Sequence, residues 1–328
     1  MDARRARGAG VGARSGWRSG QLTTVLRALR GRTVPPAPGP DGASRVDSVA
    51  LAAAAARDAL PAGALDGLDA RRRAQVLAPL DVAAGRTVRW GTAAARQVDG
   101  TTCGAAVLAL LAAAGDPRLA LWLVSGRLPD GPRPPELDGF DLPEPADPHH
   151  PDAPTWFRTP DGRVVHASAT GDEAAAARWG LLQAALHRRS TARAVAGVLP
   201  WPRALGTPPW GAARLARFPG VRYRSVLVDD TRTGEVDDLL ARVDAALDRG
   251  IPVPLYAGGD LSGGPGAAVP RHVVLAVGRS GEDYRVYEPG AGAVLPLPRA
   301  VLRSPSGPVP ALGHWTHLAW ALLPTRPR

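Results

Sequence analysis

Cys103 is the side chain best suited to covalent chemistry and the only cysteine among 328 residues. It follows Thr101 and Thr102, both good N-cap residues, and opens the apolar run C-G-A-A-V-L-A-L-L-A-A-A, which stops at Gly115. Cysteine attacks as its thiolate, and the start of a helix lowers a thiol's pKa because unpaired N–H groups there favour negative charge. The pattern indicates either a nucleophile at a helix start or a small residue that only fills a buried helix.

A cysteine nucleophile needs a base, and the base needs a partner that orients it. His272 opens H-V-V-L-A-V-G and Glu288 closes Y-R-V-Y-E, with the turn R-S-G-E-D between them, which predicts a β-hairpin. Pairing His272 directly with Glu288 centres the turn on Ser280 and sets their Cβ atoms about 5 Å apart. We therefore predict that His272 is the general base and Glu288 its orienting residue, although a one-residue slip would separate them onto opposite faces.

Gln97 is the predicted oxyanion donor. The tetrahedral intermediate of acyl transfer needs hydrogen-bond donors, commonly the backbone N–H of the nucleophile and a side-chain amide. Gln97 lies in the segment Q-V-D-G-T-T that leads into the helix of Cys103. Its amide is therefore expected to act together with the N–H of Cys103.

These motifs resemble those of the papain-like cysteine peptidases. Gln97, the helix start at Cys103-Gly104, R-H-V-V-L-A-V and Y-E-P-G-A-G are most similar to the C39-like branch, which includes the double-glycine peptidases of bacteriocin export. The chain most resembles a soluble, actinobacterial-type member of this branch. The resemblance implies that Cys103 is the nucleophile, His272 the base, Glu288 the orienting residue and Gln97 the oxyanion donor. Glu288 stands where the branch usually has Asp, and the segment between Cys103 and His272 is longer than in the compact peptidases. No transporter span is attached, so the export role is not implied.

The predicted activity is that of a cysteine-type hydrolase that cleaves a peptide or isopeptide bond through a thioester, with a peptide or protein as its substrate. An amidase, a glutaminase or an acyltransferase would use the same thiol site, because the shape of the cleft selects the acceptor. A papain-like binding protein whose site has lapsed is the alternative from another class. The sequence predicts no particular oligomeric state.

The elements expected around these residues indicate an α+β, papain-like fold, in which the nucleophile-bearing buried helix packs on a C-terminal antiparallel sheet. Residues 1–45 are rich in Arg, Gly and Pro and are predicted to be a disordered basic tail, 46–85 a helical lead-in, and 86–328 the peptidase domain. Helical patterns cover 173–188 and 237–249. The stretch I-P-V-P-L-Y at 251–256 has strand composition, and its alternate prolines predict an edge strand.

Composition argues against several other classes of protein. The net charge is +10, and because Lys is absent every basic residue counted in it is arginine. Asn is absent as well, a bias typical of a GC-rich genome. Nucleic-acid binding is not expected, since aromatic residues do not interleave with the basic ones. One cysteine excludes an intramolecular disulfide and a Cys-rich zinc site. With no secretory signal pattern and no apolar run of the length of a membrane span, a cytoplasmic protein is predicted.

No metal or cofactor is predicted. The stretch D-P-H-H-P-D at 147–152 offers His149 and His150 but lacks a third ligand at a recognisable spacing, and His314 and His317 would lie on opposite faces of a strand. The glycine-rich stretch G-G-D-L-S-G-G-P-G lacks the Lys-Ser/Thr of a phosphate-binding loop. Trp201 and Trp210 either line a substrate groove or pack beneath a loop.

Overall fold

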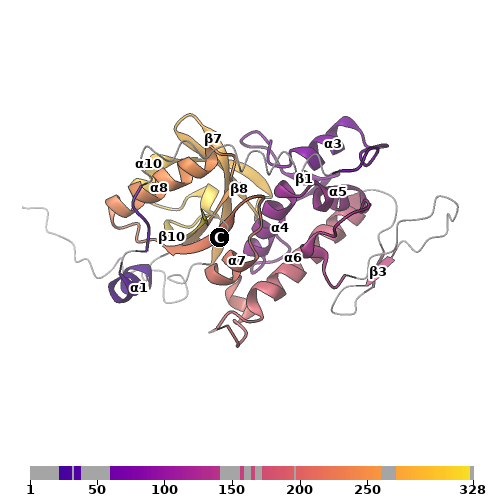
Figure 1. Ribbon diagram of the computed structural model, residues 1–328. Helices are drawn as coiled ribbons and strands as arrows, with labels where there is room; N and C mark the ends of the chain where they lie inside the picture. The colour runs from indigo at the N-terminus through magenta and orange to yellow at the C-terminus, as the bar shows by residue number, and fades with distance from the viewer. Residues whose placement is uncertain are drawn as a thin grey trace, which may run out of the picture.

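The fold is α+β, as predicted: helices from the N-terminal part of the chain pack on a six-stranded antiparallel sheet from the C-terminal part (Figure 1). The computed structural model describes residues 22–31, 33–37, 60–140, 156–158, 164–166, 172–195, 197–259 and 271–325. The sheet has the strand order β5-β10-β6-β7-β8-β9. Its strands are β5 (Arg222–Leu227), β6 (Val253–Gly258), β7 (His272–Ser280), β8 (Asp283–Glu288), β9 (Ala293–Pro298) and β10 (His317–Thr325).

Helix α4 (Cys103–Gly115) is the central helix of the fold and is buried along nearly its whole length. Its run of Ala, Val and Leu leaves no polar face, so it must be enclosed on all sides. It packs against β7, α5 (Pro117–Ser125), α6 (Asp172–Thr191) and α7 (Pro209–Leu215). The predicted buried helix is confirmed, with Cys103 as its first residue.

The sheet is covered on both faces, which explains why most of its central residues are buried. Alternation along β8 shows this: the hydroxyl of Tyr284 donates to Asp244 Oδ1 on α8 (Thr233–Leu247) at 2.7 Å, whereas that of Tyr287 donates to the carbonyl oxygen of Ala95 at 2.5 Å. Figure 1 shows α8 and α10 (Arg299–Arg303) on the side of the sheet away from α4. The sheet therefore lies between two layers of helix.

Shorter elements complete the described part of the chain. Of the predicted lead-in at 46–85, only 60–85 is described, and it contains α3 (Ala70–Leu77). The remaining strands are β1 (Arg89–Trp90), β2 (Ala93–Ala94), β3 (Trp156–Arg158) and β4 (Val164–His166), and the 3-10 turns are η2 (Pro135–Leu137), η3 (Arg203–Leu205) and η5 (Pro310–Leu312).

The prediction of disorder throughout residues 1–45 is wrong for 22–30, which form helix α1 (Leu22–Arg30). Thr24 Oγ1 donates to Asp229 Oδ1 at 3.3 Å, and Arg27 forms an ion pair with Glu235 at the start of α8. The apolar residues of L-T-T-V-L-R-A-L-R recur at helical spacing, and this local pattern outweighs the Arg, Gly and Pro of the flanking sequence. Residues 1–21, 32 and 38–45 lie outside the described ranges.

The prediction that 251–256 forms an edge strand is also wrong, because β6 lies between β10 and β7. Its ladder with β10 ends at Leu255, so Pro254 has no residue of β10 to which it would have to donate. Pro254 pairs instead with Leu275 of β7. A proline beyond the end of one ladder is compatible with a central strand, and composition alone does not reveal where that ladder stops.

In the described ranges, no helix by itself has the length and apolar character to cross a membrane. Among the described helices, only α4 and α5 taken together have that length and apolar character, and the two are bent by 113° relative to each other.

Candidate active site

A β-bulge decides how the predicted base and its partner meet. Near the turn, Arg279 pairs with Tyr284 and Ser280 with Asp283, a register that would place Glu288 opposite Leu275 and on the other face from His272. The register shifts between Ala276 and Gly278, so that Leu275 pairs with Tyr287 and Glu288 falls opposite Val274. The predicted direct pairing of His272 with Glu288 is therefore wrong by two positions. The bulge nevertheless returns both side chains to one face, as diagonal neighbours.

His272 and Glu288 form a buried hydrogen-bonded pair across this diagonal. The distance between His272 Nε2 and Glu288 Oε1 is 2.7 Å, and the two residues are only 8% and 5% exposed. The carboxylate also accepts the N–H of Gly290 at 2.8 Å and that of Ala291 at 2.6 Å, in the turn that follows β8. Because the carboxylate accepts Nε2–H, the neutral imidazole carries its proton on Nε2 and leaves Nδ1 as an acceptor.

Cys103 lies beside this pair, at the start of α4. Its Sγ is 3.4 Å from the carbonyl oxygen of Arg271, the residue immediately before His272, and the residue is 1% exposed. The hydroxyl of its N-cap residue Thr102 accepts the N–H groups of Val98 and Asp99, each at 3.1 Å, and makes no cap bond to the helix. The first N–H groups of α4 are thus not satisfied by their own N-cap side chain.

The electrostatics of the site favour a charged imidazole. Burial alone would lower the pKa of His272, but hydrogen bonding to Cys103 and to Glu288 outweighs it and raises the pKa from 6.5 to about 9. Burial likewise opposes ionisation of Glu288, yet the hydrogen bonds from His272, Ala291 and Gly290 hold the pKa of this carboxyl below its usual value. A proton taken up by His272 is therefore stabilised by the groups around it.

This coupling predicts how stability depends on pH. The raised pKa of His272 stabilises the folded state fully below the unfolded value of 6.5, and this stabilisation is lost as the pH rises through about 9. The lowered pKa of Glu288 stabilises the folded state above its unfolded value of 4.5, and that part is lost on acidification. We expect the difference in free energy of unfolding between the wild type and His272→Asn to be about 2–3 kcal/mol smaller at pH 9.5 than at pH 6, by urea titration. A difference that stays constant with pH would contradict the coupling.

Gly313, directly after η5, packs against the ring of His272. A Cβ atom at this position would lie 2.4 Å from Cδ2 and 2.5 Å from Nε2 of His272, closer than atoms can approach. Its backbone also has φ +64°, in the left-handed region that favours glycine. Gly313 is therefore the residue that lets the chain close over the edge of the imidazole that faces Glu288.

Replacing Gly313 by alanine is expected to push the imidazole away from Glu288, because the ring cannot stay in place beside a Cβ atom. Displacement of a catalytic group by about 1 Å can cost about 10²-fold in rate. Gly281→Ala is the matched control, since Gly281 has φ +61° but no atom within 4 Å of its Cβ position. Both variants are expected to lose about 1–2 kcal/mol of stability from strain. Only Gly313→Ala is expected to lower the rate of Cys103 acylation, and equal effects from both variants would exclude a role at the ring.

Hydrogen bonds tie Gln97 both to the turn after Glu288 and to the loop that leads into α4. Its backbone N–H donates to the carbonyl oxygen of Pro289 at 2.8 Å, which ties it to the residue after Glu288. Its Nε2 donates to the carbonyl oxygen of Asp99 at 2.8 Å, and an amide nitrogen has a second hydrogen to offer. Among the described residues, Gln97 Oε1 is buried without a hydrogen-bond partner. The side chain thus has one spare donor beside the start of α4.

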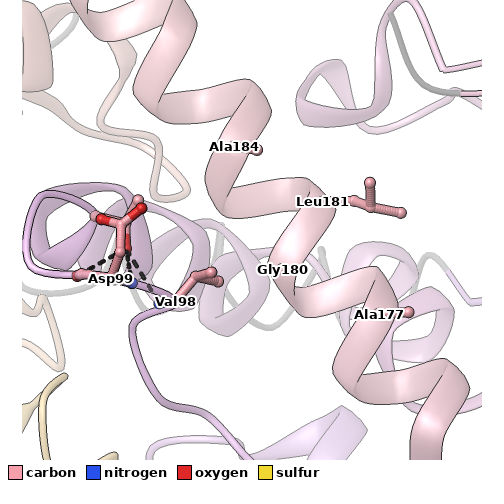
Figure 2. A pocket seen from close by; sticks show the side chains of 7 residues that line it. Val98, Asp99, Ala177, Gly180, Leu181 and Ala184 are labelled. Carbon is pink, nitrogen blue, oxygen red and sulfur yellow. Dashed lines mark hydrogen bonds between the residues drawn. The ribbon is translucent and has the colours of Figure 1, made fainter. Parts of the chain in front are cut away.

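A pocket opens next to this loop, between residues 98–102 and helix α6. It has a volume of about 400 Å³ and is lined by Val98, Asp99, Thr102, Ala177, Gly180, Leu181 and Ala184. Figure 2 shows the side chain of Val98 pointing toward α6 at Gly180. Val98 is 62% exposed, so an apolar surface lies open near the site.

Trp201 and Trp210 pack against each other. Their rings meet edge to face at 5.4 Å, and the indole of Trp210 donates to the carbonyl oxygen of Ala194 at 2.5 Å. The segment between them reaches the site, because a Cβ atom on Gly104 would lie 2.6 Å from the Cβ of Thr207. Of the two interpretations, these contacts favour packing, and a role in substrate binding stays a prediction.

The other candidate ligand sites are placed only in part. Residues 147–152, with His149 and His150, lie outside the described ranges, and so does the glycine-rich stretch at 258–266 from residue 260 onward. His317 Nδ1 is 3.2 Å from both carboxylate oxygens of Asp230, and the described residues contain no group of three or more His, Cys, Asp or Glu arranged as metal ligands.

Two contributors to the site were missed by sequence reasoning. Gly290 was visible as part of the turn after Glu288, where a Cβ atom would lie 3.1 Å from the carboxylate. Gly313 had no signal in the sequence, because its contact joins residues far apart along the chain.

Comparisons with protein-family models, with curated proteins and with solved structures found no match. The assignment of a function therefore rests on the geometry of the site.

Proposed function

We propose that this chain is a papain-like cysteine peptidase that hydrolyses a peptide or isopeptide bond. The observation that carries the proposal is the buried pair of His272 Nε2 and Glu288 Oε1, at 2.7 Å, with the thiol of Cys103 against the residue preceding His272. The pair leaves Nδ1 as the acceptor that a general base needs. An intact pair of this kind also argues against a lapsed site that serves only for binding.

In the proposed reaction, His272 Nδ1 takes the thiol proton of Cys103 and the thiolate attacks the carbonyl carbon of the substrate, forming a C–S bond. The second hydrogen of Gln97 Nε2 and the N–H of Cys103 bind the oxyanion. The intermediate then expels the amine, which receives its proton from His272, and a thioester remains. A water molecule, deprotonated by His272, attacks the thioester; the acid leaves and the thiol is restored.

Glu288 holds the imidazole in the tautomer that this sequence of steps requires, and its charge favours the imidazolium formed in each half-reaction. The shielding of the pair strengthens both effects, because charges interact more strongly away from water. A backbone hydrogen bond from Gln97 to the Pro289 carbonyl joins the Gln97 loop to the Glu288 turn, so the proposed oxyanion donor and the proposed orienting residue are directly linked.

The proposal is tested by reacting the full chain with a p-nitrophenyl ester. A burst of one p-nitrophenol per chain, together with a hydroxylamine-sensitive mass increase on Cys103, is expected. A chain that forms no thioester, although its denatured form is alkylated at Cys103, would overturn the proposal. Peptide-library cleavage compared with acyl transfer to added amines then distinguishes a peptidase from an acyltransferase that uses the same thiol, and release of ammonia from simple amides would indicate an amidase.

A further inference from the structure

We infer that Gln183, in the middle of α6, is a positioning residue for Gln97. The inference rests on the proposed function, in which Gln97 donates to the oxyanion. Gln183 is 0% exposed and lies on a helix that carries none of the proposed catalytic residues. Its side chain nevertheless bonds to the peptide groups on both sides of Gln97.

The two ends of the Gln183 amide hold the backbone on either side of Gln97. Nε2 donates to the carbonyl oxygen of Arg96 at 3.0 Å, and Oε1 accepts the N–H of Val98 at 3.2 Å, an N–H that it shares with the hydroxyl of Thr102 at 3.1 Å. The indole of Trp179, one turn earlier on α6, donates to the same Arg96 carbonyl at 2.7 Å. Helix α6 thus supplies three hydrogen bonds to the residues flanking Gln97, and Figure 2 shows it running beside this loop.

The position of the Gln97 side chain depends on these backbone hydrogen bonds, because the side chain makes few hydrogen bonds itself. Its amide makes a single bond, from Nε2 to the Asp99 carbonyl within the same loop, and Oε1 has no partner among the described residues. Its backbone N–H is held from the other side by the Pro289 carbonyl. The backbone at Gln97 is therefore clamped between α6 and the turn after Glu288, and the clamp determines where the amide points.

A buried amide is costly unless both of its ends are hydrogen-bonded, so a fully buried Gln183 constrains whichever groups it bonds. Here those groups are the peptides flanking Gln97 and, at a longer 3.4 Å, the carbonyl oxygen of Trp179 on α6 itself. Loss of the clamp allows this loop to shift, and misplacement of a stabilising group by about 1 Å can cost about 10²-fold in rate.

The test compares Gln183→Met with a matched control, Gln75→Met. Gln75 makes the same kind of clamp elsewhere: Nε2 donates to the Gly91 carbonyl at 2.8 Å and Oε1 accepts the Gly91 N–H at 2.7 Å. For each full-length variant, the rate of Cys103 acylation by a p-nitrophenyl ester and the rate of its alkylation by iodoacetamide are measured. Alkylation displaces iodide at a saturated carbon and forms no oxyanion. We expect Gln183→Met to lower the rate of acylation by about 10- to 100-fold while the rate of alkylation stays within about twofold of wild type. Gln75→Met is expected to change neither rate.

A double-mutant cycle with Gln97→Ala separates positioning from a general structural effect. If Gln183 acts through Gln97, Gln183→Met has no further effect on acylation once Gln97 is alanine. An equal fall in both backgrounds, or equal falls in acylation and alkylation, would overturn the positioning role. If Gln183→Met does not fold, Trp179→Phe removes the second donor to the Arg96 carbonyl and is expected to lower acylation in the same selective way, though less. A wild type that forms no thioester overturns the proposed function and this inference with it, whereas thioester formation unaffected by Gln183→Met overturns the inference alone.

Discussion

Replacement of Cys103 by alanine is expected to lower the rate of p-nitrophenol release from the ester by about 10⁴-fold or more, because the nucleophile itself is removed. Stability should change little, by about 1 kcal/mol, since the substitution deletes a single sulfur atom from a well-packed helix. The two effects distinguish the two interpretations of this residue. If Cys103 only fills the core, the substitution changes the stability and leaves the rate of p-nitrophenol release unchanged.

Cys103→Ser keeps the shape of the side chain but replaces the thiol with a hydroxyl that His272 cannot readily deprotonate, so its acylation rate is expected to be nearly as low. The control is Cys103→Ala combined with Ala114→Cys, which restores one thiol near the opposite end of α4. We expect this variant to be alkylated by iodoacetamide but to form no hydroxylamine-sensitive thioester at the rate of wild type. Restoration of that rate would show that the position beside His272 is not required.

The second large effect is expected at Glu288. Glu288→Gln removes the charge that favours the imidazolium and turns one of the two accepting oxygens into an NH2 donor. Either Ala291 or the pair of Gly290 and His272 then faces a donor in place of its acceptor. A change of this type costs up to about 10⁴-fold in rate in a serine protease triad, and we expect about 10²- to 10⁴-fold here. The pKa of His272 should fall from about 9 toward its ordinary 6.5. The pH dependence of Cys103 alkylation, or the imidazole resonances in NMR spectra, would report that fall.

Glu288→Asp tests the diagonal geometry. A carboxylate one methylene shorter cannot reach His272 while still accepting from Gly290 and Ala291, which bond to it at 2.8 and 2.6 Å. We expect it to lose at least 10-fold in rate, because the bulge in β7 sets Glu288 diagonally from His272 and the longer side chain spans that diagonal. Glu282→Gln, at a side chain 91% exposed in the turn of the same hairpin, is the control and should behave as wild type. Unchanged kinetics and an unchanged pH profile in Glu288→Gln would exclude Glu288 as the orienting residue.

The types of the elements could be predicted from sequence because their signals are local. The all-apolar run after Cys103 indicated a buried helix, and a turn between two strand-like segments indicated the hairpin of β7 and β8. These inferences needed only hydrophobic periodicity and turn chemistry. Two of the three errors also had local causes: a basic composition masked the helical spacing of 22–30, and prolines suggested an edge position for β6. The third, the direct pairing of His272 with Glu288, failed because of the bulge in β7.

The sequence by itself determined which side chains are available for chemistry: one thiol at a helix start, one histidine at the head of a strand and one carboxylate at the end of the next strand. Only the tertiary structure decided how they meet. The bulge after Ala276 set the face of Glu288, Gly313 closed on the imidazole, and Gln183 reached the backbone beside Gln97. Strand register has a period of two, so one extra residue reverses a face, and a contact between distant segments leaves no periodic signal in either of them.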